Sequence, residues 1–311
     1  MREPRPTTLI ESVRLSDHVG ADVVLASEAF QWTGSFKYRA AANVARSVPH
    51  PAIITASSGN FGQAIAFASR LAGKRCTVVM PANSARVKVD AVRAYGATVD
   101  LIDTTKVRRE DRVAALAAAD PSAYVASAYD DPLVIEGNAS LGRELAAINA
   151  TRRANAPFDA VLAPVGGGGL SAGVVTGLRA AGDATPVWGV EPTMANDFVR
   201  SLAAGCVITH DQEPQTIADG ARTRSVGRHN WAVLRTGLAG AVDASEAQIC
   251  EAVRLCFQLA NVKIEPTGAL ALAALLAQPE RFAGRRVCCV LSGGNVDPGV
   301  FCGIIEQRRS P

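Results

Sequence analysis

The chain has 311 residues, of which 48% are hydrophobic and 20% are charged, and its formal net charge is +3. This length allows a large buried core in one or two domains, and the composition is that of an ordinary soluble protein. The small net charge is spread along the sequence without a basic patch, which argues against a nucleic-acid partner. No apolar run reaches membrane-spanning length and the polar start is no signal peptide, so the cytoplasm is predicted.

Short apolar runs alternate with amphipathic stretches along most of the chain, which predicts an α/β fold. The runs expected to form buried strands are residues 23–25, 52–55, 76–80, 98–102, 160–163, 187–190 and 287–291. The stretches expected to form helices are residues 61–71, 84–95, 107–119, 133–148, 170–181, 247–260 and 267–276. Such alternation predicts parallel sheets that are covered by helices on both faces.

The seven cysteines predict free thiols, because their number is odd and no pair has the spacing of metal ligands. Cys76, Cys288 and Cys289 lie inside apolar runs, where a free cysteine behaves as a small hydrophobic residue. We therefore expect reduced cysteines with a structural role. None of the four histidines has a partner that would predict a catalytic triad or a zinc site.

Lys37 has a local sequence that favours a nucleophile. It follows Gly34, Ser35 and Phe36 at the point where a run of helix-forming residues begins. A lysine amine becomes nucleophilic when burial lowers its pKa, and Phe36 would supply an apolar wall. Taken alone, such a stretch is more often a solvated helix start than a catalytic site.

Three loops of small and polar residues each follow an apolar run. They are Ser57-Ser58-Gly59-Asn60, Gly166-Gly167-Gly168-Gly169 and Ser292-Gly293-Gly294-Asn295. Backbone N–H groups at a helix start attract anions, so the first loop favours a carboxylate and the second favours a phosphate. The alternatives are an ordinary N-cap for the serines and a flexible loop for the glycines.

Lys37 and these loops, in this order, resemble the fold-type II family of pyridoxal-phosphate (PLP) enzymes, in the serine/threonine dehydratase and serine racemase branch. The similarity runs from about Pro6 to the C-terminus. It implies two open, twisted, mostly parallel sheets flanked by helices, with PLP in the cleft between two domains. Residues 1–51 and 132–311 would form the large PLP-binding domain, and residues 52–131 the small inserted domain. The family is usually dimeric, so the resemblance also implies a homodimer. Because the last motif lies close to Pro311, we expect no C-terminal regulatory domain of the kind that biosynthetic threonine dehydratases carry.

The resemblance implies a role for individual residues. Lys37 would hold PLP as a Schiff base and take the α-proton of the substrate, and Ser58 would act from the opposite face. The substrate carboxylate would bind to Ser57, Ser58, Gly59 and Asn60, and Asn60 would also contact the ring hydroxyl of PLP. The other cofactor contacts would come from Phe36, Gly166, Gly167, Gly168, Gly169, Glu265 and Ser292.

Ser292 would meet the pyridine nitrogen of PLP in this resemblance. A hydroxyl cannot hold that nitrogen protonated as an aspartate would, so the ring is a weaker electron sink, which favours β-elimination. Two departures affect substrate recognition. Phe61 stands where relatives often have histidine, and residues 136–140 depart from the sequence that usually follows the motif matched by Tyr129-Asp130-Asp131-Pro132.

Glu191, Ala195 and Asp197 resemble the metal site of serine racemases and related dehydratases. Two carboxylates and an intervening carbonyl would supply the oxygen ligands that Mg²⁺ or Ca²⁺ prefers. The alternative is a pair of acidic residues that opens a helix, which the helix dipole favours without any metal.

These observations predict a PLP-dependent ammonia-lyase that converts serine, threonine or 3-hydroxyaspartate to a 2-oxo acid and ammonia. An amino-acid racemase on the same site is the alternative among enzymes. A silent homologue that binds an amino acid or PLP is the alternative from another class, and the presence of Lys37, Ser58 and Ser292 argues against it. The sequence does not rank the three substrates.

Overall fold

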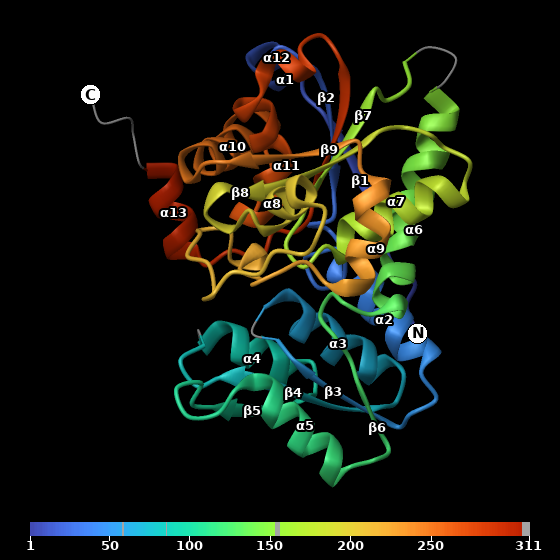
Figure 1. Cartoon of the computed structure of the whole chain (residues 1–311), viewed down its shortest axis with the longest axis vertical. Helices are drawn as coiled ribbons and strands as arrows, with labels where there is room; N and C mark the ends of the chain where they lie inside the picture. Colours follow the sequence, from blue (N-terminus) through green and yellow to red (C-terminus); the bar gives the residue numbers. More distant parts are fainter. Residues whose placement is uncertain (58, 85, 153–155, 307–311) are drawn as a thin grey trace.

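The computed structural model describes residues 1–57, 59–84, 86–152 and 156–306. Two sheets form two lobes that lie one above the other in Figure 1. The fold class is the one that the sequence predicts, because both sheets are mostly parallel and have helices beside them. All seven predicted strands and all seven predicted helices are present, with ends shifted by a few residues.

The larger sheet has six strands in the order β1-β2-β10-β7-β8-β9, and β1 alone runs antiparallel to its neighbour. Its strands are β1 (Thr8–Glu11), β2 (Asp22–Ser27), β7 (Ala160–Pro164), β8 (Val187–Pro192), β9 (Gly240–Ala244) and β10 (Arg286–Leu291). Successive side chains of β10 point into two different apolar clusters. Val287 and Cys289 belong to one cluster, and Cys288 and Val290 belong to the other. The strand is therefore buried on both faces, as its continuous apolar sequence predicts.

Ten α-helices of the described residues lie outside residues 52–131. They are α1 (Val13–Val19), α2 (Lys37–Ser47), α6 (Pro132–Arg152), α7 (Gly169–Ala180), α8 (Asp197–Ala204), α9 (Arg228–Gly237), α10 (Glu246–Ala260), α11 (Pro266–Ala277), α12 (Pro279–Phe282) and α13 (Pro298–Glu306). Helix α11 is apolar all round and its side chains are almost entirely buried, which explains why it lies against the sheet.

The smaller sheet has four parallel strands in the order β5-β4-β3-β6. Its elements are β3 (Ala52–Ala56), α3 (Asn60–Leu71), β4 (Arg75–Pro81), α4 (Arg86–Ala94), β5 (Thr98–Ile102), α5 (Arg109–Ala119) and β6 (Ala123–Val125). The apolar cluster around α3 also contains Tyr38 and Val44 of α2. Helix α2 thus packs on the smaller lobe, and the predicted domain limits at residues 52 and 131 stay a prediction.

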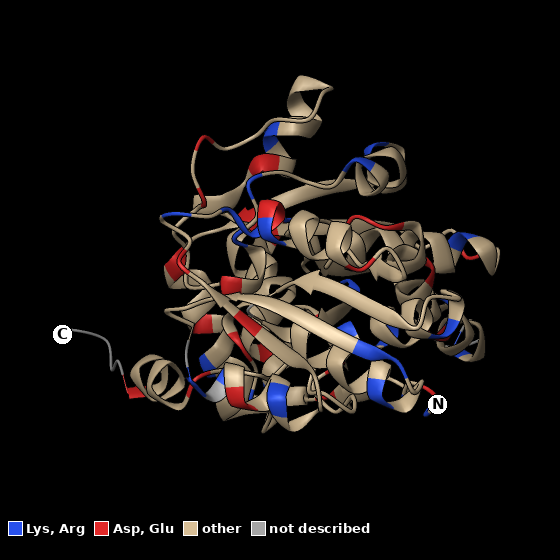
Figure 2. Ribbon diagram, turned by 90° about the horizontal axis from the view of Figure 1, so that it is seen from below, with Lys and Arg blue, Asp and Glu red and all other residues tan. Residues whose placement is uncertain are grey.

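All seven cysteines lie in the described part of the chain and are free thiols, as predicted. Acidic and basic residues are interspersed on the ribbon in Figure 2, without a region of one sign. Within the residues that the structure describes, every helix is too short or too polar to cross a membrane.

Candidate active site

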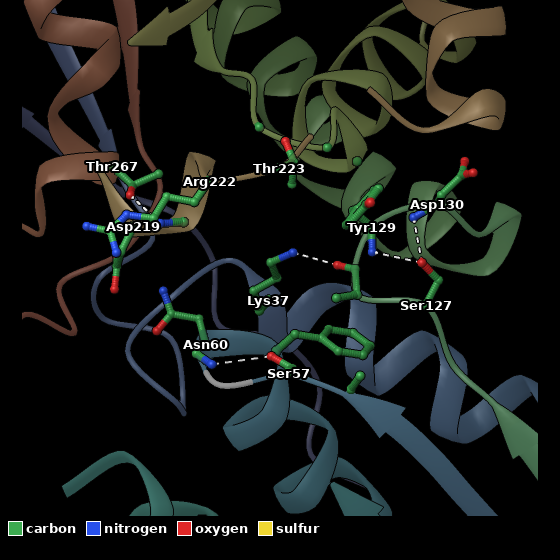
Figure 3. A pocket seen from close by; sticks show the side chains of 18 of the residues that line it. Lys37, Ser57, Asn60, Ser127, Tyr129, Asp130, Asp219, Arg222, Thr223 and Thr267 are labelled. Carbon is green, nitrogen blue, oxygen red and sulfur yellow. Dashed lines mark hydrogen bonds between the residues drawn. The ribbon is translucent and has the colours of Figure 1, made fainter. Parts of the chain in front are cut away.

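A cavity of about 960 Å³ lies between the two lobes, where the predicted motifs come together. It is lined by Phe36, Lys37, Ser57, Gly59, Asn60, Gly166, Gly167, Gly168, Gly169, Glu265 and Ser292, among others. Figure 3 shows Lys37 in the middle of the pocket, with Ser57 and Asn60 on one side and Thr223 on the other. Ligands of open α/β sheets bind beyond the carboxyl ends of the strands, which is where this cavity lies.

Lys37 is the first residue of α2, and its Nζ atom donates a 2.6 Å hydrogen bond to the carbonyl oxygen of Ala128. The ring centroids of Phe36 and Phe61 lie 5.0 and 5.6 Å from Nζ. Desolvation lowers the pKa of Lys37 from 10.5 to about 8, against the opposing attraction of Glu265. Lys37 therefore has a substantial neutral fraction near neutral pH, which a nucleophilic amine requires.

The start of α2 is fixed by a buried ion pair. The guanidinium of Arg39 binds both carboxylate oxygens of Glu28, with Nε–Oε2 at 2.6 Å and Nη2–Oε1 at 2.9 Å. Glu28 follows β2, and its own N–H donates to the carbonyl oxygen of Leu291 at the end of β10. The N–H of Phe36 donates to the carbonyl oxygen of Ser292, 3.0 Å away, so Lys37 and Ser292 are held at the same edge of the sheet.

The first loop forms the N-terminal cap of α3. The hydroxyl of Ser57 accepts hydrogen bonds from the N–H groups of Gly62 at 3.0 Å and Gly59 at 3.4 Å. Ser57, Gly59 and Asn60 all line the cavity, and their contact with the substrate carboxylate stays a prediction. Ser58, the predicted second catalytic residue, lies outside the described residues, so its role stays a prediction.

The glycine loop passes close to neighbouring segments, and this explains its lack of side chains. A Cβ on Gly167 would lie 2.2 Å from the ring of Tyr129, and Gly168 has a φ of +90°. The carbonyl oxygen of Gly167 accepts hydrogen bonds from Asn230 Nδ2 at 2.6 Å and from the N–H of Gly227 at 3.0 Å. With the carbonyl held away, the N–H groups at the start of α7 can face an anion in the cavity.

Glu265 and Asn60 meet across the cavity, although 205 residues separate them in the chain. Asn60 Nδ2 donates a 2.8 Å hydrogen bond to Glu265 Oε1. Burial raises the pKa of Glu265 to about 8, and repulsion from Asp219 adds to the effect. Near pH 8 the carboxyl group beside Lys37 therefore loses its proton, and its ionised form attracts the Lys37 ammonium.

The predicted metal ligands do not line this cavity: Glu191 lies near the end of β8, Ala195 in the turn that follows and Asp197 at the start of α8. Glu191 accepts hydrogen bonds from the N–H groups of Phe198 and Val199, and Asp197 Oδ2 accepts from the N–H of Val226. Burial raises the pKa of both carboxyl groups, to about 6 for Asp197. Asp197 Oδ1 has no hydrogen-bond partner among the described residues, and His210 Nε2 lies 3.9 Å from it.

The described residues contain no group of three or more His, Cys, Asp or Glu side chains that could hold a metal ion. A metal site here would need the backbone carbonyl of Ala195, a buried residue in the turn between the two acids. The predicted Mg²⁺ or Ca²⁺ therefore has no support from side chains beyond two carboxylates. The alternative, in which Glu191 and Asp197 are only acidic residues that open a helix, does not explain why both carboxyl groups are buried.

Some residues of the cavity carry no signal in the sequence that would single them out. Arg109 and Lys88 line the cavity but resemble ordinary surface cations in the sequence. Asn230 binds the glycine loop without lining the cavity, and it lies on α9, a helix that the apolar pattern does not predict. Asn295 was part of a predicted loop, but its contact with Asn60 spans 235 residues. Motif order locates the loops, whereas only the structure shows which side chains meet.

The comparisons with known proteins agree with this geometry. The family model described as "Pyridoxal-phosphate dependent enzyme" matches residues 1–293. An L-threo-3-hydroxyaspartate ammonia-lyase of Pseudomonas sp is 35% identical over 96% of this chain and 93% of its own length. The serine racemase of Homo sapiens is 33% identical over 98% of this chain and 90% of its own length.

Among solved structures, a threonine deaminase described as that of T.th. superimposes with a TM-score of 0.89. It is 40% identical, and the match covers 94% of each chain. This chain belongs to the pyridoxal-phosphate dependent enzyme family, and the predicted resemblance is confirmed.

Proposed function

We propose that the chain is a PLP-dependent ammonia-lyase that acts on small β-hydroxy amino acids. The observation that carries the proposal is the desolvated amine of Lys37, with a pKa of about 8, inside the large cavity between the lobes. The same cavity is lined by the glycine loop and by Ser292. Relatives with more than 30% identity that carry the names of lyases and racemases support the same reading.

The residues of the cavity fit PLP. The glycine loop is a cradle that side chains would fill, since a Cβ on Gly169 would lie 2.8 Å from the carbonyl oxygen of Tyr129. We assign the phosphate to residues 166–169, the ring to Phe36 and Asn60, and the pyridine nitrogen to Ser292. PLP, when bound, supplies an electron sink for the α-carbon of an amino acid.

Lys37 and the loop before α3 would handle the substrate. The N–H groups around Ser57, Gly59 and Asn60 would bind the α-carboxylate at the positive end of the α3 dipole. Nζ of Lys37, as a neutral amine, would take the α-proton. The β-hydroxyl would leave as water, and the enamine that is released would tautomerise to an imine, which water hydrolyses to a 2-oxo acid and ammonia.

We propose 3-hydroxyaspartate as the first substrate to test among the three. Its second carboxylate needs a cation, and Lys88, Arg109, Arg222 and Arg224 all line the cavity. Lys88 already pairs with Asp219 at 2.8 Å, whereas the Nε atoms of Arg222 and Arg224 are bound by backbone carbonyls. Three relatives are ammonia-lyases or dehydratases of hydroxyaspartate by name, which supports the same order of testing.

A racemase is the second candidate, because serine racemases are also among the relatives. Racemisation needs a proton donor on the face of the α-carbon that Lys37 does not reach. Ser58 is the proposed group, by its place in the loop motif.

We also propose that Glu191, Ala195 and Asp197 hold a structural Mg²⁺ or Ca²⁺. The unpartnered, buried Oδ1 of Asp197 supports this, since hard oxygen donors suit such cations. A homodimer and a cytoplasmic location are further proposals, and they rest on the family alone.

A substrate panel tests the proposal. Purified protein with PLP is incubated with serine, threonine and 3-hydroxyaspartate, and the release of pyruvate, 2-oxobutanoate and oxaloacetate is measured beside ammonia. We expect equal amounts of oxo acid and ammonia from at least one substrate. Release of neither product from any of them would contradict the lyase assignment.

A further inference from the structure

Asn295 connects three motifs that are far apart in the sequence. Its Nδ2 atom donates two hydrogen bonds of 2.8 Å, one to the carbonyl oxygen of Thr33 and one to Asn60 Oδ1. Asn60 Nδ2 in turn donates to Glu265 Oε1. Asn60, Glu265 and Asn295 all line the cavity that holds Lys37. One chain of hydrogen bonds therefore runs from the loop before Lys37 to the cavity.

The hydrogen bond between Asn295 and Thr33 determines which way each amide in this series of hydrogen bonds is turned. A backbone carbonyl such as that of Thr33 can only accept, so the amide of Asn295 must present its nitrogen to it. The second hydrogen of that nitrogen reaches Asn60, which must therefore present its oxygen. The nitrogen of Asn60 is then directed the other way, toward Glu265. Turning Asn295 alone would place its oxygen against the Thr33 carbonyl oxygen, and turning Asn60 alone would place its nitrogen against the Asn295 nitrogen.

Two glycines allow this arrangement. A Cβ on Gly34 would lie 2.2 Å from Asn295 Oδ1, and a Cβ on Gly293 would lie 2.6 Å from Glu265 Oε1. Side chains at these positions would displace the first and the last side chain of the hydrogen-bonded chain. Gly34 and Gly293 thus leave space for the side chains of Asn295 and Glu265, in addition to any role of their backbone conformation.

We propose that Asn295 is a positioning residue that fixes the Asn60 amide with its N–H side toward the ring oxygen of the cofactor. The inference rests on the proposed function, in which Asn60 contacts that oxygen. An N–H donor stabilises the ionised form of a ring oxygen, whereas an amide oxygen would stabilise the protonated form. Asn295 therefore sets the ionisation of a cofactor that it need not touch.

Asn295→Asp tests the direction of the chain, because it keeps the shape and replaces the donor by an acceptor. The Asn60 amide must then turn its nitrogen toward residue 295 and its oxygen toward the cavity. We expect the absorbance ratio of the protonated to the ionised form of bound PLP to rise about tenfold, as for an exchanged hydrogen bond to a charged group. The measurement is the visible spectrum of the PLP-loaded protein at a fixed pH.

Asn43→Asp is the matched control. Asn43 lies on the same helix as Lys37 but outside the cavity, and its Nδ2 donates a 2.8 Å hydrogen bond to the carbonyl oxygen of Leu133. The control loses the same kind of bond, so it accounts for a general loss of stability. We expect its spectrum to match that of the wild type.

Asn295→Ala is the second test variant, and it is used if Asn295→Asp does not fold. It removes the donor without adding a charge, and we expect a smaller rise of the same ratio. If the wild type binds PLP and the folded variant has the same spectrum as the wild type, the inference about Asn295 is wrong while the proposed function still stands. A wild type that shows no visible band with PLP would overturn the proposed function and this inference with it.

Discussion

The Nζ atom of Lys37 lies 2.6 Å from the carbonyl oxygen of Ala128 and donates a hydrogen bond to it. Lys37 opens α2, whereas Ala128 lies in the loop between β6 and α6, so the bond joins two segments that line the cavity. A neutral amine keeps hydrogens for this bond while its lone pair stays available. The contact can therefore hold Lys37 in place without blocking attack on a carbonyl carbon.

The pH dependence of cofactor uptake follows from the lowered pKa of Lys37. Because the pKa of Lys37 in the folded protein is about 8 in place of 10.5, the fraction of neutral amine increases as the pH rises through 8. Below that pH, the rate of PLP uptake by cofactor-free protein should rise about tenfold for each pH unit and then level off. Stopped-flow absorbance after mixing with PLP measures this rate.

Glu265→Gln provides the control for this profile. The attraction of Glu265 raises the pKa of Lys37, so its removal should move the midpoint of the profile to lower pH. A wild-type rate that keeps rising to the ordinary lysine pKa would show that Lys37 is not desolvated.

Gly167→Ala should weaken PLP binding by about tenfold or more, because overpacking of a tight site costs about 1–3 kcal/mol. The new Cβ would lie 2.2–2.7 Å from three ring atoms of Tyr129. Equilibrium titration with PLP, followed by absorbance, gives the affinity. Removal of the ring in the double variant Gly167→Ala/Tyr129→Ala should restore part of it.

Gly303→Ala is the matched control, since a Cβ there meets nothing within 4 Å. Its affinity for PLP should equal that of the wild type. Equal affinity in Gly167→Ala as well would remove the glycine loop from the cofactor site.

The fold was predictable where the sequence has long apolar runs. The buried strands β10 and β7 and the helix α11 have such runs, because side chains on both faces must be apolar. The edge strands β5 and β9 bury fewer side chains, and β9, with the sequence Gly240–Ala244, gave no apolar run that would predict it. Short edge strands are defined by their neighbours, and that information lies elsewhere in the chain.

The site was predictable to the extent that it consists of local motifs. Lys37, Asn60, the glycine loop and Ser292 each lie in a short stretch with its own signal, and all of them line one cavity. The bond between Asn295 and Asn60 could not be predicted, because no local pattern fixes which amide faces which. The packing of Tyr129 on Gly167 depends on tertiary structure in the same way.

Removal of divalent metal tests the proposed cation site. Because Asp197 Oδ1 is buried without a partner among the described residues, a bound cation should stabilise the folded protein. A chelator should lower the melting temperature, and Mg²⁺ or Ca²⁺ in about hundredfold excess over its dissociation constant should restore about 2.7 kcal/mol. Differential scanning calorimetry measures both changes.

Asp197→Ala should abolish this response to metal, whereas Asp120→Ala, at the end of α5 in the smaller lobe, should retain it. If the chelator leaves the melting of the wild type unchanged, the acidic pair holds no cation.

Ser58→Ala separates racemisation from elimination. Proton transfer on both faces of the α-carbon is needed for racemisation, and Lys37 serves one face. We expect the variant to lose racemase activity and elimination from D-substrates, with elimination from the L-substrate retained. Chiral analysis of recovered serine, beside oxo-acid release, gives both rates. Racemisation at the wild-type rate in the variant would exclude Ser58 as the second group.

The covalent link between Lys37 and PLP is the most direct test of the account. The protein is reduced with borohydride in the presence of PLP and digested, and the modified peptide is identified by mass spectrometry. We predict a single modified lysine, Lys37, in the wild type, and no labelled site and no oxo-acid release in Lys37→Ala or Lys37→Arg, since a guanidinium stays protonated. Modification of a different lysine, or normal turnover by Lys37→Ala, would contradict the account.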